Sequence, residues 1–376
     1  MGSLKSYIDD FDARLGRINT VAPKVSVIVT NYNYANYIGD CLNSVSQQSY
    51  PDLECIVVDD RSNDESVERI RRFLDNDKSA VSFRLVNHDT TRGQYSAFRT
   101  GIKHATGAFI AFLDADDLLL PDFIGEHVRV HLTHPPVAFT SSNQYQIDST
   151  GQVIGGVHPD LLTQHSYRMI GTVSLHRPFW VWATTSSMVF RRAVLDYVFA
   201  ELDDAFRKCA DNYVAHFCNL LGGSILVPLV LGCYRRHENN SFSKNPLIGG
   251  RLPTGDMRHH PAHDVVLKSI RRRLLDCPEQ FIALLGRSGF LHTLSKVTPV
   301  ADLWRHGEAL RDSAVIGLTQ LGNFYSIWGL LYLRWAVRHV RNRHPGFTAV
   351  DLEGSKRAAA KVTNYADYQR HRRDAK

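Results

Sequence analysis

The stretch that decides the fold is FIAFLDADD, residues 109–117. A short apolar run that ends in acidic residues is typical of a strand covered on both faces of a sheet. Two similar runs precede it, VSVIVTN at residues 25–31 and LECIVVDD at residues 53–60. Because open α/β sheets bind ligands at the carboxyl ends of their strands, we expect the polar residues after these runs to line a ligand site.

Strands and helices alternate from residue 24 to about residue 142. This pattern predicts βαβ units, a mainly parallel sheet and right-handed crossovers. The expected strands are VSVIVT, LECIVVD, VSFRLVNH and FIAFLD, and the expected helices cover residues 35–47, 64–74 and 94–105. The fold class is therefore predicted to be α/β, with helices flanking a Rossmann-like sheet.

Asp114 and Asp116 are the strongest candidates for a metal site. Two carboxylates one residue apart offer oxygen ligands to a hard divalent cation. Mg²⁺ or Mn²⁺ held by few protein oxygens is usually completed by substrate phosphates. Three acids directly after an apolar strand would be costly without a purpose. We therefore expect a divalent metal site that also meets a phosphorylated ligand.

Six segments in order, VSVIVTNYN, VVDDRSND, RGQYSAFRTGI, GAFIAFLDADD, ADNY and YRRHENNS, resemble the motifs of the family 2 glycosyltransferases. The resemblance covers roughly residues 24–243, and it rests on the order and spacing of the motifs rather than on any one of them. It implies an inverting enzyme of the GT-A fold that uses a nucleotide sugar, with a UDP-sugar as the expected donor and Mn²⁺ or Mg²⁺ as the cofactor.

The chain is expected to divide into four parts. These are an N-terminal helix over residues 1–23, a GT-A catalytic domain over 24–240, a linker rich in Pro and Gly over 241–257, and a helical basic extension over 258–376. Within the catalytic domain, residues 24–142 are expected to hold the nucleotide sugar. Residues 143–240, which include a predicted strand SMVFRR and a predicted helix DNYVAHFCNLL, are expected to bear the acceptor face.

The resemblance places the nucleotide at the ends of the first strands. It assigns Asp60 to the ring N–H of uracil, with Thr30 and Tyr32 flanking the base. A carboxylate can accept from an imide N–H, and an aromatic ring can stack on a base. Arg92 lies near the position of a basic residue that contacts the nucleotide, although many family members carry Asn there. A turn carboxylate and a half-exposed loop tyrosine are the competing interpretations of Asp60 and Tyr32.

In the family, the second carboxylate of the acidic pair binds the metal. This assigns the metal to Asp116 and the sugar nucleotide to Asp114. His237 matches an element that returns to the diphosphate, where an imidazole can complete the metal shell or donate to a phosphate oxygen. Arg235, or its neighbour Arg236, is expected to pair with the phosphates. A surface loop is the alternative interpretation of this segment.

Asp211, in ADNYVAHF, matches the position of the catalytic base at a helix start. A base there would remove the proton of the acceptor hydroxyl as its oxygen attacks the anomeric carbon, and one displacement would invert the configuration. An acidic residue often precedes this Asp in the family, and Ala210 takes its place here. Either the acceptor geometry differs, or Asp204 substitutes. Complementarity to the helix dipole would also place a carboxylate at this point.

Two other functions compete with the glycosyltransferase hypothesis. A nucleotidyltransferase would share the nucleotide site and the acidic metal ligands, but it normally has a glycine-rich loop after the first strand, and TNYNYANY has no glycine before Gly39. The second alternative is an inactive scaffold that acts through its basic tail. The retained Asp60, Asp114, Asp116 and Asp211 argue against it.

The formal net charge of +6 is distributed unevenly over the 376 residues. Residues 241–376 hold 22 Lys+Arg against 11 Asp+Glu, leaving 22 against 27 for residues 1–240. A basic extension with an aromatic stripe over residues 324–335 would suit peripheral membrane contact, oligomerisation or packing on the catalytic domain with a solvated basic face. No nucleic-acid partner is expected, because the extension lacks a recognisable nucleic-acid module.

Cysteine usage and hydropathy bear on location. The six cysteines have no paired or zinc spacing and several lie in apolar contexts, which predicts buried, reduced thiols. No signal-like apolar core stands at the N-terminus, and no run reaches the roughly 18 apolar residues of a spanning helix. We expect a cytoplasmic protein, with peripheral contact at the inner face of the membrane as an open alternative, and a glycan or lipid-linked acceptor in polysaccharide or glycolipid assembly.

Overall fold

The computed structural model describes residues 22–134, 136–155, 167–176, 180–200, 206, 210–238 and 261–298. Four of the sequence predictions fall outside the described residues. They are the N-terminal helix before Pro23, the linker over residues 241–257, the aromatic stripe over residues 324–335, and Asp204 as an alternative base.

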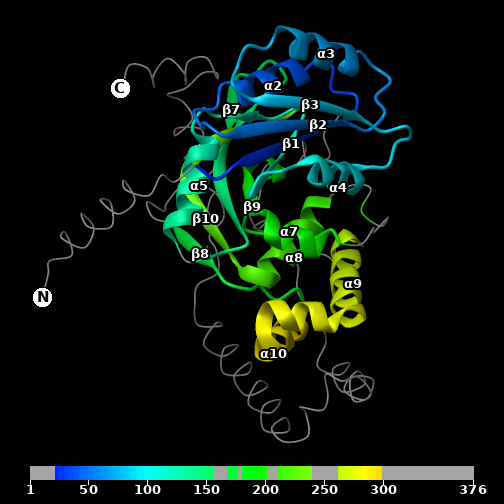
Figure 1. Cartoon of the computed structure of the whole chain (residues 1–376), viewed down its shortest axis with the longest axis vertical. Helices are drawn as coiled ribbons and strands as arrows, with labels where there is room; N and C mark the ends of the chain where they lie inside the picture. The colour runs from blue at the N-terminus through cyan, green and yellow to red at the C-terminus, as the bar shows by residue number, and fades with distance from the viewer. Residues whose placement is uncertain are drawn as a thin grey trace, which may run out of the picture.

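A mixed ten-stranded sheet forms the centre of the molecule (Figure 1). Eight of its strands follow the order β3-β2-β1-β4-β9-β6-β10-β5, while β7 pairs with β6 and β8 pairs with β10. The strands that run parallel are β1 (Val25–Asn31), β2 (Leu53–Asp59), β3 (Ser82–Asn87), β4 (Phe109–Asp114), β6 (Phe139–Ile147) and β10 (Ser224–Arg235). The antiparallel strands are β5 (Leu118–Leu119), β7 (Val153–Gly155), β8 (Arg168–Ile170) and β9 (Met188–Arg191). The predicted α/β fold with a mainly parallel sheet is confirmed.

Helices cover both faces of the sheet (Figure 1). Helices α2 (Ile38–Ser46), α3 (Ser66–Asn76) and α5 (Phe123–Thr133) share one hydrophobic cluster, and α4 (Gln94–His104), α7 (Arg192–Val198) and α8 (Ala210–Gly222) share another. Side chains of β1 alternate between them, because Val27 and Val29 join the first cluster and Ile28 joins the second. Helix α4 lies so close to β1 that a Cβ at Gly101 would come within 2.2 Å of Ile28.

Strand register brings the polar strand ends together. Thr30 at the end of β1 is paired with Asp114 at the end of β4, and Asn31 is paired with Asp59 at the end of β2. The parallel strands therefore present their carboxyl ends at one edge of the sheet. This edge is where the sequence predicted a ligand site.

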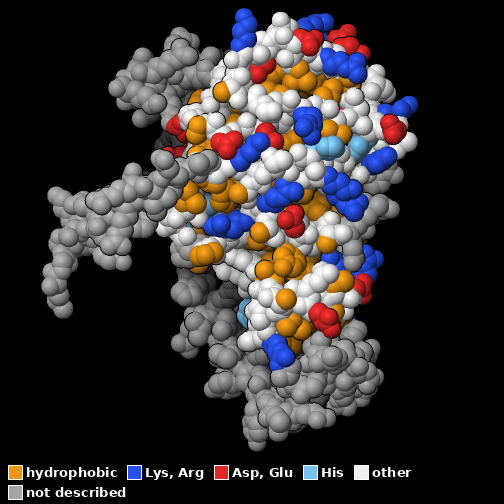
Figure 2. All heavy atoms as spheres, viewed as in Figure 1, with side chains coloured by type: hydrophobic (Ala, Val, Ile, Leu, Met, Phe, Trp, Pro, Cys, Tyr) orange, Lys and Arg blue, Asp and Glu red, His pale blue; other side chains and the backbone are white. Residues whose placement is uncertain are grey.

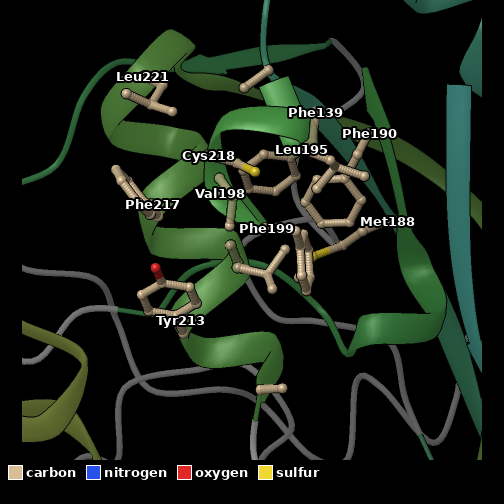
Figure 3. Packing of buried hydrophobic residues seen from close by; sticks show 14 of the residues in the cluster. Phe139, Met188, Phe190, Leu195, Val198, Phe199, Tyr213, Phe217, Cys218 and Leu221 are labelled. Carbon is tan, nitrogen blue, oxygen red and sulfur yellow. The ribbon is translucent and has the colours of Figure 1, made fainter. Parts of the chain in front are cut away.

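The second hydrophobic cluster combines aliphatic and aromatic side chains of the sheet and the helices (Figure 3). Phe190 of β9 and Leu195 of α7 lie next to each other there, and Phe217 of α8 contacts Tyr213 at a ring-centroid distance of 5.6 Å. Each of Phe190, Leu195 and Phe217 is at most 1% exposed. Buried side chains of β9, α7 and α8 belong to this one cluster, which packs α8 against the sheet. The start of α8 is thereby fixed relative to β4.

Helices α9 (Pro261–Asp276) and α10 (Pro278–Val297) extend the same cluster on the side of α8 away from the sheet (Figure 1). Their buried apolar residues are Val266, Ile270, Leu274, Phe281, Phe290, Leu294 and Val297. The backbone N–H of Leu175 donates to the carbonyl of Lys296 at 3.0 Å, and His263 Nε2 lies 2.9 Å from the Leu175 carbonyl. The first two helices beyond the predicted linker are therefore part of the core of the catalytic unit.

Three sequence expectations concern helix hydropathy, surface charge and the cysteines. Within the described part of the chain, no helix has the length and apolarity needed to cross a membrane. On the face shown in Figure 2, Lys and Arg side chains are interspersed with Asp and Glu rather than gathered in one patch. The described cysteines have free thiols, and Cys41, Cys55, Cys218 and Cys233 are buried, as the sequence predicted.

Candidate active site

The acidic turn that follows β4 is the centre of the candidate site. Asp114 is partly buried at the strand end, where the Thr30 hydroxyl donates to its Oδ1 at 3.2 Å and Gln94 Nε2 donates to the same oxygen at 3.3 Å. Burial, together with the charges of Asp116 and Asp211, raises the pKa of Asp114 to about 7. A carboxylate this poorly solvated among other acids is typical of a functional site, and a bound cation would favour its ionised form.

Asp116 and His237 form the part of the site that could hold a metal ion. His237 Nε2 lies 2.9 Å from Asp116 Oδ2, and its ring contacts Tyr34 and Tyr37 at centroid distances of 5.8 and 4.9 Å. Among the residues that the structure describes, no group of three or more His, Cys, Asp or Glu is placed to hold an ion. One carboxylate and one imidazole fit a Mn²⁺ or Mg²⁺ ion whose remaining ligands are water and diphosphate oxygens.

Arg235 is enclosed beneath the acidic turn rather than open to a ligand. Its backbone N–H donates to Asp117 Oδ1 and its Nε donates to the Asp116 carbonyl, both at 2.8 Å. The guanidinium lies 4.8 Å from the ring centre of Tyr37 and donates to Asp40 at 3.3 Å, and the residue is 2% exposed. This enclosure favours a supporting part for Arg235 over the predicted direct contact with phosphates.

Asp117 is the most deeply buried acid of the turn, at 0% exposure. Burial and the charges of its two acidic neighbours raise its pKa well above the ordinary value. Its Oδ1 accepts the Arg235 backbone N–H, so the carboxyl ties the turn to β10. These contacts favour a structural part for Asp117 over a place in the metal shell.

Asp60 organises the loop that leads into α4. Its Oδ1 accepts the backbone N–H of Arg92 at 2.8 Å and its Oδ2 accepts that of Gly93 at 2.7 Å. His88 Nδ1 lies 2.7 Å from Oδ1, and Asp60 is only 5% exposed. The side chain of Arg92 is exposed. Asp60 therefore shapes the backbone beside the site, and its predicted contact with uracil stays a prediction, as does the contact of Arg92 with the nucleotide.

Tyr32 lies on the solvent side of the same edge. The residue is 46% exposed, directly after Asn31, whose amide is buried against Asp59 at 2.7 Å. The next residue, Asn33, has a φ of 62°, and its backbone N–H donates to Ser62 at 2.9 Å. A turn anchored in this way presents an accessible ring at a fixed place, which suits the stacking that was predicted for Tyr32.

Asp211 reaches the acidic turn from the other half of the sheet. It lies in the first turn of α8, and its charge acts on Asp114. Burial raises its pKa, although hydrogen bonds from the Asn212 backbone and the Thr185 side chain oppose the shift. The structure thus brings the predicted base and the predicted donor carboxylate to one site from segments nearly 100 residues apart.

Sequence reasoning missed the turn η1 (Thr185–Ser187), which lies beneath the site. The hydroxyl of Ser186 accepts the backbone N–H of Asp114 at 3.1 Å, and Thr184 donates to Gln144 at 2.8 Å. With the bond from Thr185 to Asp211, this short segment connects the acidic turn, α8 and β6. Four hydroxyl residues in a row, TTSS, directly before a predicted strand were the signal that could have identified it.

Comparison with known proteins gives a consistent result. The sequence model of glycosyl transferase family 2 matches residues 26–198. An uncharacterised glycosyltransferase of Nostoc sp. is 31% identical over 226 residues, which cover 58% of this chain and 66% of that protein. A PGL/p-HBAD biosynthesis glycosyltransferase of Mycobacterium bovis is 35% identical over 131 residues, which cover 32% of this chain and 50% of that protein. The chain thus matches these relatives over about two thirds and one half of their own lengths.

Comparison with solved structures gives partial matches. TarS of S. aureus (1–349, in complex with UDP-GlcNAc) matches with a TM-score of 0.47 and 15% identity, covering 76% of this chain and 92% of that one. The mannosyltransferase PcManGT of Pyrobaculum calidifontis, in complex with GDP-Man and Mn²⁺, matches with a TM-score of 0.44 and 19% identity, covering 90% and 94%.

The α/β sheet topology and the family match together indicate the glycosyltransferase class of proteins. The chain belongs to the family 2 glycosyltransferases and is a transferase enzyme. This assignment favours a glycosyltransferase over the nucleotidyltransferase alternative.

Proposed function

We propose that the protein transfers a sugar from a nucleotide sugar, specifically a UDP-sugar, to an acceptor hydroxyl with inversion at the anomeric carbon, in the presence of Mn²⁺ or Mg²⁺. One observation carries the proposal. Asp211, the candidate base, lies close enough to Asp114, the candidate donor contact, for its charge to raise the pKa of that residue. A single-displacement transfer requires the donor and the base to share one site in this way.

The donor side of the proposed reaction uses the carboxyl edge of the sheet. Asp116 and His237 would hold the cation, and a cation bound there would stabilise negative charge on the diphosphate as it leaves. Asp114, oriented by the Thr30 hydroxyl at 3.2 Å, would contact the sugar nucleotide. The exposed ring of Tyr32 would stack on the base. These residues bind and orient the donor without supplying the proton transfer.

Asp211 would carry the proton transfer. A general base is most effective when its pKa approaches the working pH, and burial raises the pKa of Asp211 in that direction. Its carboxylate would accept the proton of the acceptor hydroxyl as the oxygen attacks the anomeric carbon. The hydrogen bond from Thr185 would hold the carboxylate in one rotamer during this step.

The acceptor that we infer is a hydroxyl of a glycan or of a lipid-linked saccharide. The support is the matched relative whose name places it in PGL/p-HBAD biosynthesis, together with the basic composition of residues 241–376. A basic segment would bring the enzyme close to an anionic bilayer in which such an acceptor resides. We propose a cytoplasmic enzyme that works at the inner face of the membrane.

The donor proposal is tested with a panel of nucleotide sugars in Mn²⁺, scored for the slow hydrolysis that transferases show without an acceptor. We expect a UDP-sugar to be hydrolysed fastest and hydrolysis to stop in EDTA. Hydrolysis that persists unchanged in EDTA would contradict the metal part of the proposal. Absence of both hydrolysis and calorimetric binding for every UDP-sugar would contradict the donor part.

A further inference from the structure

Gln94 joins the two halves of the candidate site through one side chain. Its Nε2 donates to Asp114 Oδ1 at 3.3 Å, and its Oε1 accepts the backbone N–H of Ala210 at 3.0 Å. Ala210 is the first residue of α8 and directly precedes Asp211. The same amide group therefore touches the acid that would contact the donor and the start of the helix that carries the base.

Both ends of the Gln94 amide are chemically matched to their partners. A backbone N–H can only donate, so the Gln94 oxygen must face Ala210, which leaves the nitrogen to donate to the ionised carboxylate of Asp114. Rotation of the amide by 180° would place two acceptors together and two donors together. The bridge consequently has one orientation, and it fixes the separation of the two elements that it joins.

Hydrogen bonds around the start of α4 fix the backbone position of Gln94. It is the first residue of α4, after Gly93, whose φ of 87° turns the chain into the helix. Asp60 holds the backbone N–H of Gly93 at 2.7 Å, and His88, which contacts Asp60, also lies 2.8 Å from the Thr100 hydroxyl within α4. This network sets where α4 begins. The Gln94 side chain therefore projects from an immobile point.

The first backbone N–H of α8 needs a hydrogen-bond acceptor from outside the helix. The first backbone N–H groups of a helix have no partner within the helix, and those of α8 point toward the site. Ala210 has no polar side chain that could take part in capping, and it is 0% exposed, so water does not replace the partner. Gln94 supplies the acceptor for this N–H from a segment 116 residues earlier in the chain.

We propose that Gln94 is a positioning residue that sets the distance between the donor-contacting carboxylate Asp114 and the base-bearing helix start at Ala210 and Asp211. The proposal rests on the proposed function for the roles of Asp114 and Asp211. It adds that the alignment of donor and base depends on one amide that acts through its contacts with Asp114 and Ala210.

The bridge is first tested without any turnover, by amide hydrogen exchange at Ala210. In Gln94→Met, which keeps the side-chain length and removes both hydrogen bonds, the Ala210 amide should exchange roughly five- to tenfold faster, while amides further along α8 keep their protection. Gln94→Glu keeps an acceptor oxygen and should leave Ala210 protected. The control is Gln152→Met, because Gln152 is exposed. Unchanged Ala210 exchange in Gln94→Met would overturn the bridge.

The positioning role is tested by a double-mutant cycle on sugar transfer. Gln94→Met should lower kcat on the order of tenfold with the donor KM within about twofold, because alignment is lost and donor contacts remain. In an Asp211→Asn background the same change should cost less than about twofold, since no base remains to be aligned. An equal loss in both backgrounds would overturn the role. A wild-type enzyme inactive on every nucleotide sugar would instead refute the proposed function, and the exchange result would still decide the bridge.

Discussion

The carboxyl edge of the sheet and the helical layer formed by α8, α9 and α10 differ in the kind of residue that they bury. At the edge, Asp60, Asp114 and Asp117 are buried or partly buried acids, each fixed by hydrogen bonds. In the helical layer, Phe217 of α8 and Phe281 of α10 are apolar and fully buried. Burying acids costs free energy, and burying aromatic side chains supplies it. The site is therefore electrostatically strained, and the distant helices stabilise the fold that holds it.

The largest effect should follow a change at the edge that removes the metal ligand. Asp116→Ala should abolish turnover and weaken UDP binding in Mn²⁺, but change UDP binding little in EDTA, because Asp116 acts only through the cation. Calorimetry of UDP binding under both conditions measures this. Asp75→Ala is the matched control, because Asp75 lies exposed on α3. Equal UDP affinity of wild type and Asp116→Ala in Mn²⁺ would exclude Asp116 as the ligand.

A second change at the edge should separate chemistry from binding. Asp211→Asn should lower the transfer rate by a factor on the order of 10²–10⁴ and keep UDP-sugar affinity within a fewfold, since a general base acts on the transition state. Single-turnover transfer and calorimetry measure the two quantities. If the variant transfers sugar at the wild-type rate, the base lies elsewhere, and Asp204 is the next candidate.

The pH dependence of transfer tests the same residue in the wild type. Asp211 must be deprotonated to act as a base, and burial raises its pKa above the ordinary value of 3.8. The rate should therefore fall on acidification, and the fall should begin at a higher pH than for a solvated carboxyl. A kcat profile with acceptor at saturation measures it. A rate that stays level down to the ordinary carboxyl pKa would contradict the assignment.

In the helical layer, loss of packing should change stability and leave chemistry intact. Phe281→Ala should lower the free energy of unfolding by about 3–5 kcal/mol, because the ring is 0% exposed and packs on Phe217. The kcat of the folded fraction should not change. Leu284→Ala, at a residue 39% exposed in the same helix, should cost less than about 1 kcal/mol. Equal losses from the two variants in denaturant unfolding would mean that α10 is not part of the core.

The smallest effect concerns a buried histidine in the layer on the other face of the sheet. Burial lowers the pKa of His131 from 6.5 to about 4. Because the unfolded chain takes up the proton first, His131 contributes stability that is present above about pH 6.5 and is lost as the pH falls toward 4. When the pH falls from about 7.5 to about 5, the free energy of unfolding should decrease by about 2 kcal/mol less in His131→Gln than in the wild type, as measured by denaturant unfolding at each pH. His104 is exposed, so His104→Gln should show the same pH dependence of the free energy of unfolding as the wild type. If His131→Gln also shows the wild-type pH dependence, the lowered pKa of His131 is contradicted.

The first half of the sheet could be predicted because its signals are local. Each of the strands β1, β2 and β4 is an apolar run that ends in polar residues, and the structure places Thr30, Asp60 and Asp114 at the ends of these strands as expected. The meeting of Asp116 with His237 was also expected, from the resemblance of YRRHENNS to a segment that returns to the diphosphate.

The remaining parts could not be predicted because they depend on distant partners. Strand β6 reads FTSSNQYQI, a polar run, yet Ser141 and Ser142 are 0% exposed because their hydroxyls pair with η1. The enclosure of Arg235 depends on Asp40, 195 residues away, and the contact of Gln94 with Ala210 spans 116 residues. No periodicity or motif in one sequence encodes such pairs.

The most direct test of the account is a crystal structure of the wild-type enzyme with UDP and Mn²⁺, with the metal located by its anomalous scattering. The central claim is that the acidic turn after β4 holds the metal and the donor diphosphate next to the base. We expect one peak bonded to the Asp116 carboxylate and the His237 imidazole, with the diphosphate oxygens completing its shell and Asp211 on the side where the sugar would lie. A peak that contacts neither Asp116 nor His237, or a diphosphate bound away from the ends of β1 and β4, would contradict the claim.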